Sequence, residues 1–202
     1  MNDLDYEDCL LNIPYPRPDA YNSLAMPVYN AAAYEFNSAA DMEAAFCGKT
    51  ADHTYSRITN PTVQFFEERV KHIVGAYNVT ALNSGMAAIS NVFMTVAYSG
   101  ANIVTARHLF GNTYSFFANT LKAFDVEIRF CDLTNPEEIR KNTDENTCAI
   151  FLEIITNPQM EVVDLTAINA IAKEKNVPLI ADTTIISFSV FKARNFGVDI
   201  EV

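Results

Sequence analysis

The stretch Asn83-Ser84-Gly85-Met86-Ala87-Ala88-Ile89 decides the fold of this chain. It follows a short apolar run at 79–82 and precedes a helix-like run at 87–97, which predicts a strand-to-helix junction. Because the first N–H groups of a helix lack partners within the helix and carry the positive end of its dipole, such a junction can hold a phosphate or another anion. By itself the stretch favours an ordinary turn, and only its neighbours along the chain change that balance.

From residue 78 onward, short apolar runs alternate with helix-like segments. Strands are expected at 79–82, 102–106, 126–131, 148–155 and 178–182, with another beginning near 198, and helices at 84–98, 113–124, 136–142 and 165–175. Strands that are apolar throughout and separated by helices form a parallel sheet covered on both faces. The sequence therefore predicts an α/β protein with three α/β/α layers and a mostly parallel sheet.

Polar residues follow several of these strands, at the edge where open parallel sheets bind ligands. Ser84 follows the first strand, Phe110 lies beyond the second, Asn157 beyond the fourth, and Asp182 ends the fifth. An acid directly after the apolar run 178–181 is costly to bury unless a donor meets it. That donor can be a protonated ring nitrogen, an arginine, a backbone N–H or a metal. The alternative is an aspartate that only caps the following turn.

The first part of the chain has a different character. Residues 1 to about 30 are rich in proline, which predicts an extended arm or an unstructured tail. A short helix is expected at 38–47, capped by Ser38 or Asp41, and a longer one from Pro61, capped by Asn60, to about residue 74. Between these helices, Tyr55 and Arg57 lie in a loop, either as ordinary surface residues or as a phenol and a guanidinium aimed at an anion.

Composition excludes several classes of function. The 202 residues carry 14 basic and 25 acidic side chains, a net charge of −11, which argues against nucleic-acid and anionic-membrane partners. The four cysteines form no C-x-x-C pair and have no histidine at metal-ligand spacing, so they are interpreted as reduced, mostly buried thiols of a cytoplasmic protein without a metal site. The acidic start lacks the order of a signal peptide, and no apolar run is long enough to span a membrane.

Five motifs in register carry a resemblance to a known family. They are Tyr55-Ser56-Arg57 with Asn60-Pro61-Thr62, Ser84-Gly85-Met86-Ala87-Ala88, Phe110-Gly111-Asn112-Thr113-Tyr114, Glu153 with Thr156-Asn157-Pro158, and Asp182-Thr183-Thr184. In order and spacing they resemble the pyridoxal-phosphate enzymes of cysteine and methionine metabolism. That family includes O-acetylhomoserine sulfhydrylase, methionine gamma-lyase and the cystathionine synthases and lyases. The resemblance runs from about Pro27 to the last residue.

The resemblance implies a set of cofactor-binding residues for pyridoxal 5'-phosphate. Backbone amides of Gly85 and Met86 would hold the phosphate, and Asp182 would keep the pyridinium nitrogen protonated so that the ring acts as an electron sink. Phe110 would stack on the ring. The remaining members of the implied set are Ser84, Thr184, Asn157 near the ring oxygen and the substrate carboxylate, and Tyr55 and Arg57, which would reach the cofactor phosphate of a neighbouring subunit.

The resemblance also implies an architecture. Residues 55–202 would be the large, cofactor-binding domain of a fold type I transferase, incomplete at its C-terminal side, and 1–54 an N-terminal arm with a short helix. The assembly would be a homotetramer, a dimer of dimers. The Schiff-base lysine is expected in a Ser-x-Thr-Lys context beyond Val202, so no catalytic residue is assigned. Only Lys192 follows Asp182, in a stretch that matches the segment before the lysine-bearing strand.

Three hypotheses about function remain open. The first is gamma-replacement on an O-acetylhomoserine-type substrate, with methionine gamma-lyase or a cystathionine lyase or synthase as the alternative. The second is a non-catalytic fragment that folds and assembles without turnover. The third, a nucleotide-binding doubly wound domain, is disfavoured because the chain lacks a G-x-G-x-x-G turn and a P-loop lysine. Two positions depart from the family pattern: Phe110 stands where tyrosine is usual, and Thr183 where asparagine is more frequent. Phenylalanine can stack on a ring but has no hydroxyl for proton transfer.

Overall fold

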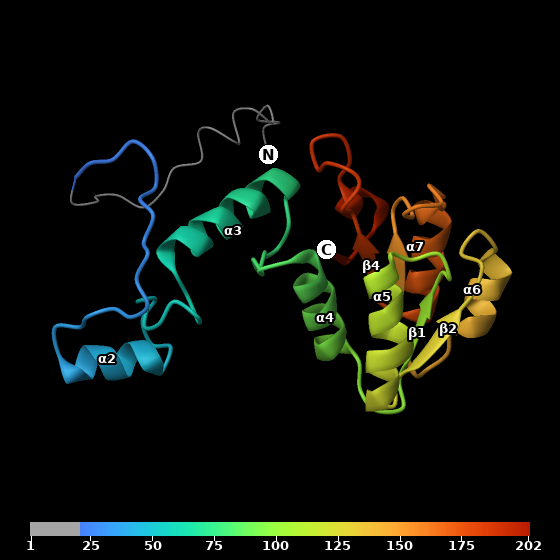
Figure 1. Cartoon of the computed structure of the whole chain (residues 1–202), viewed down its shortest axis with the longest axis horizontal. Coiled ribbons are helices and arrows are strands. Elements are labelled where there is room, and N and C mark those ends of the chain that lie inside the picture. Colours follow the sequence, from blue (N-terminus) through green and yellow to red (C-terminus); the bar gives the residue numbers. More distant parts are fainter. Residues whose placement is uncertain (1–20) are drawn as a thin grey trace. The chain divides into compact units, whose positions relative to one another are not determined.

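A computed structural model describes residues 21–202. The chain divides into two compact units, residues 1–81 and 82–202, and Figure 1 shows their elements. The proline-rich arm predicted for the first 30 residues therefore lies mostly outside the described residues. No helix of the described part is long and apolar enough to cross a membrane.

Among the described residues of the first unit, two helices begin and end where local signals predict. Helix α2 spans Ala39–Phe46, and the Ser38 hydroxyl caps it by accepting the Asp41 N–H at 3.1 Å. Helix α3 spans Pro61–Val74. Asn60 caps its start, and Gly75 ends it in the left-handed conformation, φ 67°, which glycine adopts without steric cost. Both predicted helices of this unit are confirmed.

The second unit is built on a five-stranded sheet in the order β2-β1-β3-β4-β5, in which every neighbouring pair is parallel. The strands are β1 Asn102–Thr105, β2 Glu127–Phe130, β3 Thr147–Glu153, β4 Leu179–Asp182 and β5 Ile200–Glu201. Around them lie α4 Gly85–Val96, α5 Gly111–Ser115, η1 Phe116–Thr120, η2 Leu121–Phe124, α6 Pro136–Asn142, α7 Leu165–Lys175 and η3 Ala193–Phe196. The predicted parallel α/β sheet is confirmed.

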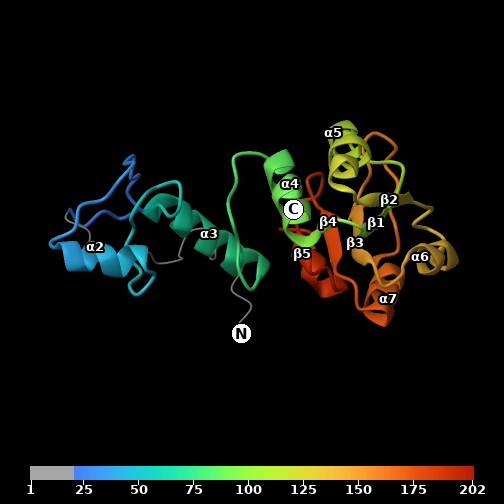
Figure 2. The same cartoon turned by 90° about the horizontal axis from the view of Figure 1, so that it is seen from below.

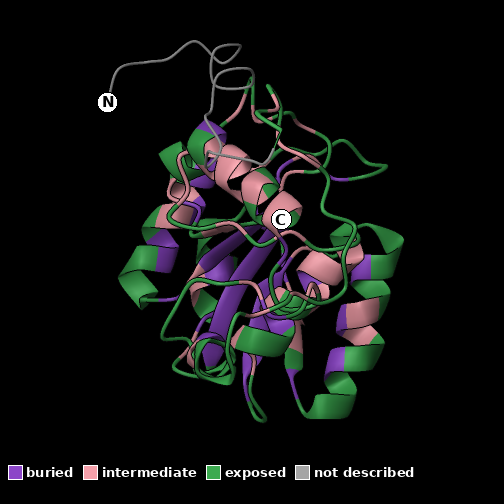
Figure 3. Ribbon diagram, turned by 90° about the vertical axis from the view of Figure 1, so that its left-hand side faces the viewer, coloured by how far each residue is buried: buried purple, intermediate pink, exposed green. Residues whose placement is uncertain are grey.

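Alternate residues of each central strand enter opposite apolar layers. Along β3, Ala149 and Phe151 pack with α4 and the α5–η2 segment, whereas Ile150 and Leu152 pack with α6 and α7. Figure 2 shows these helices on the two sides of the sheet, and Figure 3 shows the strands as its buried centre. Because both faces are covered, all seven residues of β3 are buried, which is why its sequence is apolar almost throughout. The unit is a three-layer α/β/α fold.

Two predicted elements differ from the structure. Residues 79–82 form no strand, because a strand needs a paired neighbour and the backbone of this run pairs with no described strand. The Ala81 N–H instead donates to the Glu67 side chain at 2.7 Å. The helix predicted at 113–124 begins earlier, at Gly111, and changes from α to π to 3-10 geometry along its length.

The described cysteines differ in burial between the two units. Cys131 and Cys148 are buried in the second unit, and burial raises the pKa of each thiol to about 11. Cys47 is exposed, so two of the three described cysteines are buried, as expected for mostly buried thiols. Cys9 lies outside the described residues.

Candidate functional site

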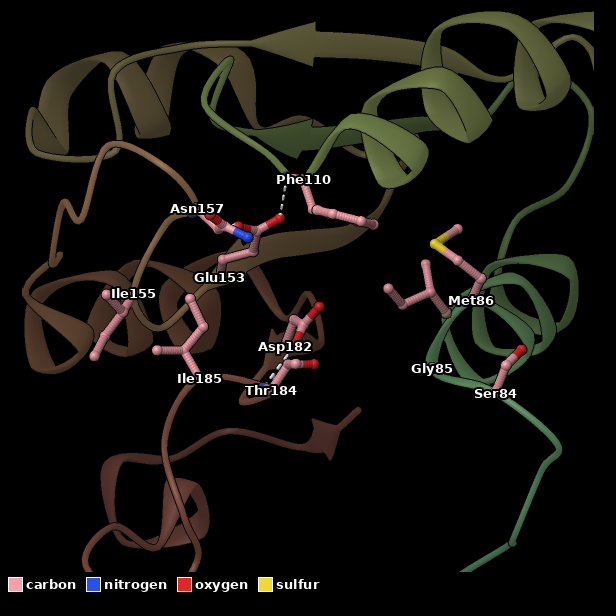
Figure 4. A pocket seen from close by; sticks show the side chains of 11 residues that line it. Ser84, Gly85, Met86, Phe110, Glu153, Ile155, Asn157, Asp182, Thr184 and Ile185 are labelled. Carbon is pink, nitrogen blue, oxygen red and sulfur yellow. Dashed lines mark hydrogen bonds between the residues drawn. The ribbon is translucent and has the colours of Figure 1, made fainter.

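A cavity of about 340 Å³ lies at the carboxyl ends of the strands, entirely within the second unit (Figure 4). Residues from the start of α4, from the ends of β3 and β4 and from the loops after β1, β3 and β4 line it. They are Ser84, Gly85, Met86, Ile89, Phe110, Glu153, Ile155, Asn157, Asp182, Thr184 and Ile185. The strand order places these segments together, since parallel strands end at one edge of the sheet.

One wall of the cavity is the start of helix α4. The Ser84 hydroxyl accepts the N–H of Ala87 at 3.1 Å, which satisfies one of the unpaired donors of the first turn. The N–H groups of Gly85 and Met86 have no acceptor among the described residues, and the first turn contains no acidic side chain. A Cβ atom added to Gly85 would meet no atom within 4 Å, so open space adjoins these amides. This wall can bind an anion.

The opposite wall carries the carboxylate of Asp182 at the end of β4. Its Oδ1 accepts the Thr184 N–H at 2.8 Å, so the residue caps the following turn, as the simpler interpretation of the sequence allowed. Its Oδ2 has no hydrogen bond within the described chain, and the residue lines the cavity (Figure 4). Capping of the turn therefore uses Oδ1 of Asp182 and leaves Oδ2 free to accept from a cationic group or an N–H donor of a ligand. The two interpretations of Asp182 are compatible.

Two further side chains approach the space between these walls. Phe110 stands at the start of α5, is 44% exposed and lines the cavity, where an aromatic ring can stack on a flat ligand. Asn157 follows β3 and lines the cavity from the adjoining loop. An anion-binding helix start, a free carboxylate oxygen and an aromatic face around one cavity suit a flat heterocycle that carries an anionic group at one end and a protonated nitrogen at the other.

Tyr55 and Arg57 belong to the first unit, whereas the cavity is built from the second. The Arg57 guanidinium stacks over the Tyr55 ring, with its carbon 5.0 Å from the ring centroid, and Tyr55 is 38% exposed. Neither lines the cavity. Their assignment to a neighbouring subunit stays a prediction.

No lysine lines the cavity, and Lys192 is exposed at the start of η3. Within the described residues, no group of three or more His, Cys, Asp or Glu side chains is placed to hold a metal ion. The cavity thus offers hydrogen-bond donors, one free carboxylate oxygen and apolar surface.

The sequence places Glu153 in one of the family motifs but assigns it no role, and it does not identify Ile155 or Ile185 as lining residues. Glu153 is 6% exposed and ends a strand that is otherwise apolar from residue 148 onward. An acid in such a run is the signal that could have found it, because a buried carboxylate requires donors from elsewhere in the fold. The two isoleucines give no comparable signal, since their placement depends on how the loops after β3 and β4 fold back.

The fold and the cavity define an α/β protein whose ligand site lies at the carboxyl edge of a parallel sheet, with the donors described above. The model of one family, the Cys/Met metabolism PLP-dependent enzymes, matches residues 10–202, and the chain belongs to this family. The family resemblance stated from the motifs is thereby confirmed, and the cofactor of the family is pyridoxal 5'-phosphate.

Curated relatives come from several branches of the family. The chain is 36% identical over 186 residues to homocysteine/cysteine synthase of Saccharomyces cerevisiae, covering 92% of this chain and 42% of the relative. It is 34% identical over 178 residues to O-acetyl-L-homoserine sulfhydrylase of Corynebacterium glutamicum, covering 88% and 41%. It is 34% identical over 183 residues to L-methionine gamma-lyase of Fusobacterium nucleatum, covering 90% and 46%. The chain therefore spans less than half the length of these relatives.

Solved structures agree with this placement. A putative O-acetylhomoserine (thiol)-lyase from Campylobacter jejuni, which carries a pyridoxyl-lysine monophosphate, superposes with a TM-score of 0.91 at 31% identity, over 98% of this chain and 49% of that one. An O-acetylhomoserine sulfhydrylase from Wolinella succinogenes is 44% identical, with a TM-score of 0.69 over 71% of this chain and 40% of that one. The three-layer architecture is thus the large-domain fold of PLP-dependent enzymes, here in part.

Proposed function

We propose that the chain is the cofactor-binding part of an enzyme of sulfur amino-acid metabolism and that its second unit binds pyridoxal 5'-phosphate. The observation that carries this proposal is that the unpaired amides of Gly85 and Met86 and the free carboxylate oxygen of Asp182 line the same cavity. An anion at one wall and a protonated ring nitrogen at the other would satisfy both sets of groups.

Most of the polar lining residues, together with Phe110, then have a role toward the cofactor. The amides of Gly85 and Met86 hold the phosphate while Ser84 keeps the helix start in place. Asp182 accepts a hydrogen bond from the protonated ring nitrogen, and the Thr184 N–H, which donates to Asp182 Oδ1, fixes the orientation of that carboxylate. Phe110 covers a ring face, and Asn157 donates to polar groups at the ring edge. When bound, the cofactor supplies an electron sink, and a protonated ring nitrogen next to Asp182 strengthens it.

For the reaction we propose gamma-replacement on O-acetylhomoserine or a similar small amino-acid substrate. The support is the similarity to sulfhydrylases in Corynebacterium glutamicum and Wolinella succinogenes. Gamma-elimination is the second candidate, because the chain is 34% identical to a methionine gamma-lyase, the same identity as to the sulfhydrylase of Corynebacterium glutamicum. The distinction between replacement and elimination rests on similarity alone.

For the assembly we propose a cytoplasmic homotetramer in which an arm at 1–54 precedes a cofactor domain that begins at residue 55. Tyr55 and Arg57 would serve the cavity of the neighbouring subunit. Two observations support this: both residues lie outside the unit that holds the cavity, and the guanidinium of Arg57 forms no ion pair with a described residue. The unbonded thiols of Cys47, Cys131 and Cys148 suit a reducing compartment.

A non-catalytic role of the 202 residues is the competing hypothesis, and one observation favours it: no lysine lines the cavity. Under this hypothesis the cavity still binds the cofactor, without turnover, because nucleophilic attachment and proton transfer need a basic side chain within reach. Both hypotheses therefore predict binding, and only turnover separates them.

Cofactor binding can be tested on the full 202-residue chain with pyridoxine 5'-phosphate, which lacks the aldehyde and so cannot react with surface lysines. We expect saturable binding by calorimetry and a fall in affinity of about tenfold or more for Asp182→Asn, because a charge-assisted hydrogen bond is lost. Glu145→Gln is the matched control, since Glu145 is exposed and precedes β3, at the end of the sheet away from the cavity. Unchanged affinity in Asp182→Asn, or no binding by the wild type, would reject the proposed site.

A further inference from the structure

Glu153 is the only charged side chain that is buried among residues 21–202. It ends β3 and lies in register with Asp182, which ends β4, so two carboxylates stand side by side at the edge of the sheet. No Lys, Arg or His of the described chain forms an ion pair with it. A buried carboxylate without a cation is costly, and at this position an apolar residue would continue the pattern of β3. Glu153 therefore calls for an explanation other than core packing.

Its two oxygens accept hydrogen bonds from two different loops. Oε1 accepts the backbone N–H of Phe110 at 2.5 Å, and Oε2 accepts the backbone N–H of Asn157 at 3.3 Å. Phe110 belongs to the connection between β1 and α5, whereas Asn157 belongs to the connection that follows β3. One side chain thus connects two segments that are far apart in the sequence. Figure 4 shows Glu153 beneath both residues.

The electrostatics agree with this geometry. Burial raises the pKa of the Glu153 carboxyl, its hydrogen bonds from Phe110 and Asn157 lower it, and the neighbouring charge of Asp182 raises it again. Burial has the largest effect, so the pKa of this carboxyl lies above its usual value, and the two amides act against that rise. The ionised form can accept from both loops at once. A protonated carboxyl would have to turn one of its oxygens into a donor.

We propose that Glu153 is a positioning residue that sets the placement of Phe110 relative to Asn157, and so the shape of the space in which a flat ring can bind. This inference rests on the proposed function, because Phe110 and Asn157 are the residues assigned to the ring face and the ring edge. Glu153 does not itself touch the ring in this proposal. It acts through the backbone of its two partners, and a small displacement of groups that hold a ligand is enough to weaken binding.

Two substitutions separate positioning from simple stability. Glu153→Gln keeps the shape and one acceptor oxygen but presents an NH₂ group to the second amide, so at least one loop loses its hydrogen bond. Glu153→Met keeps a similar length and removes the buried charge, which leaves the sheet stable but gives neither amide an acceptor. Glu145→Gln removes the same charge from an exposed position.

The first readout is hydrogen exchange of the Phe110 and Asn157 amides in the full chain, which needs no ligand. We expect at least tenfold faster exchange at one of them in Glu153→Gln and at both in Glu153→Met, with the strand amides and the Glu145→Gln control unchanged. The second readout is affinity for pyridoxine 5'-phosphate, which we expect to fall by about three- to thirtyfold in both variants. A melting temperature for each variant shows whether the fold is retained.

The outcomes are distinct. Faster exchange together with weaker binding, in a variant that still melts cooperatively, supports the positioning role. Wild-type exchange at both amides, or wild-type affinity in Glu153→Met, overturns it while the proposed function stands. If the wild-type chain itself fails to bind pyridoxine 5'-phosphate, the proposed function fails first and the role of Glu153 toward a ring fails with it. If Glu153→Gln does not fold, Glu153→Met carries the same comparison.

Discussion

The two units of the chain are stabilised in different ways. In residues 82–202, two layers of buried apolar side chains cover the two faces of a parallel sheet. In residues 21–81, the buried side chains are only Ala45, Thr54, Asn60 and Ile73. The contrast shows that helix formation and core formation are separable within one chain, because local caps can define a helix while only packing between elements provides most of its stability.

In the first unit, one buried asparagine, Asn60, connects several segments by hydrogen bonds. Asn60 caps α3 through its Oδ1, and its Nδ2 lies within hydrogen-bond distance of the Tyr29 carbonyl at 3.0 Å and the Ser56 hydroxyl at 3.0 Å. The apolar face of α3 remains partly open, with Phe66 57% exposed. The second unit instead relies on rings such as Phe151, which contacts Phe93 and Phe117 edge to face.

The largest expected difference between the units comes from matched phenylalanine truncations. Phe151→Ala removes a fully buried ring from the central strand β3 and should lower the free energy of unfolding of the second unit by about 3–5 kcal/mol. Phe66→Ala removes a half-exposed ring from α3 and should change the free energy of unfolding of the first unit by less than about 0.5 kcal/mol. Urea denaturation followed by circular dichroism measures both. Equal losses for the two variants would contradict the contrast between the units.

A smaller difference is expected between two helix caps. Asn60→Ala should cost about 2 kcal/mol in local opening of α3, because the variant loses the cap and the hydrogen bonds to two other segments. Asp164 caps the packed helix α7 by accepting the N–H groups of Thr166 and Ala167. Asp164→Ala loses only this cap and should cost about 1 kcal/mol in local opening of α7. Hydrogen exchange resolved by helix gives both values, and a larger effect at α7 would refute the role given to Asn60.

The smallest effect concerns a polar cluster at the amino end of the sheet. Hydrogen bonds from Arg129 at 2.6 Å and Asn102 at 2.8 Å lower the pKa of Asp144 from 3.8 to about 2. Since the pKa is lower in the folded state, this contribution to stability is fully present above pH 3.8 and disappears as the pH falls toward about 2. The variant Asp144→Asn has no ionisable carboxyl at this position and lacks this pH-dependent contribution to stability. The difference in melting temperature between wild type and variant should therefore shrink over that pH range, whereas a constant difference would count against the assignment.

Local signals in the sequence predict most elements of both units. The Asn60-Pro61 start and the Gly75 end of α3 are confirmed residue by residue, and so are the bounds of α6 and α7. These succeed because a cap, a proline or a left-handed glycine acts within a few residues of its own position. The strand predicted at 79–82 is wrong because strand formation depends on a partner, and the sequence of a run does not say whether a partner is present.

Part of the candidate site follows from the same reasoning. Ser84, Phe110, Asn157 and Asp182 were singled out because they follow predicted strands, and the structure brings them to one cavity. Their roles toward a cofactor stay predictions. Glu153 could not be given a role from the sequence, since its function depends on two backbone amides that only the folded loops bring to its oxygens.

The sequence by itself determined most of the strands and helices in their order, the caps that begin the helices and the family to which the chain belongs, because these depend on neighbouring residues and on motifs in fixed order. The tertiary structure decided which strand ends meet, which side chains line the cavity and how the carboxylate of Glu153 is satisfied. Those features depend on the strand order β2-β1-β3-β4-β5, because this order brings together segments that are far apart in the chain. Burial and hydrogen bonding then hold these segments in contact.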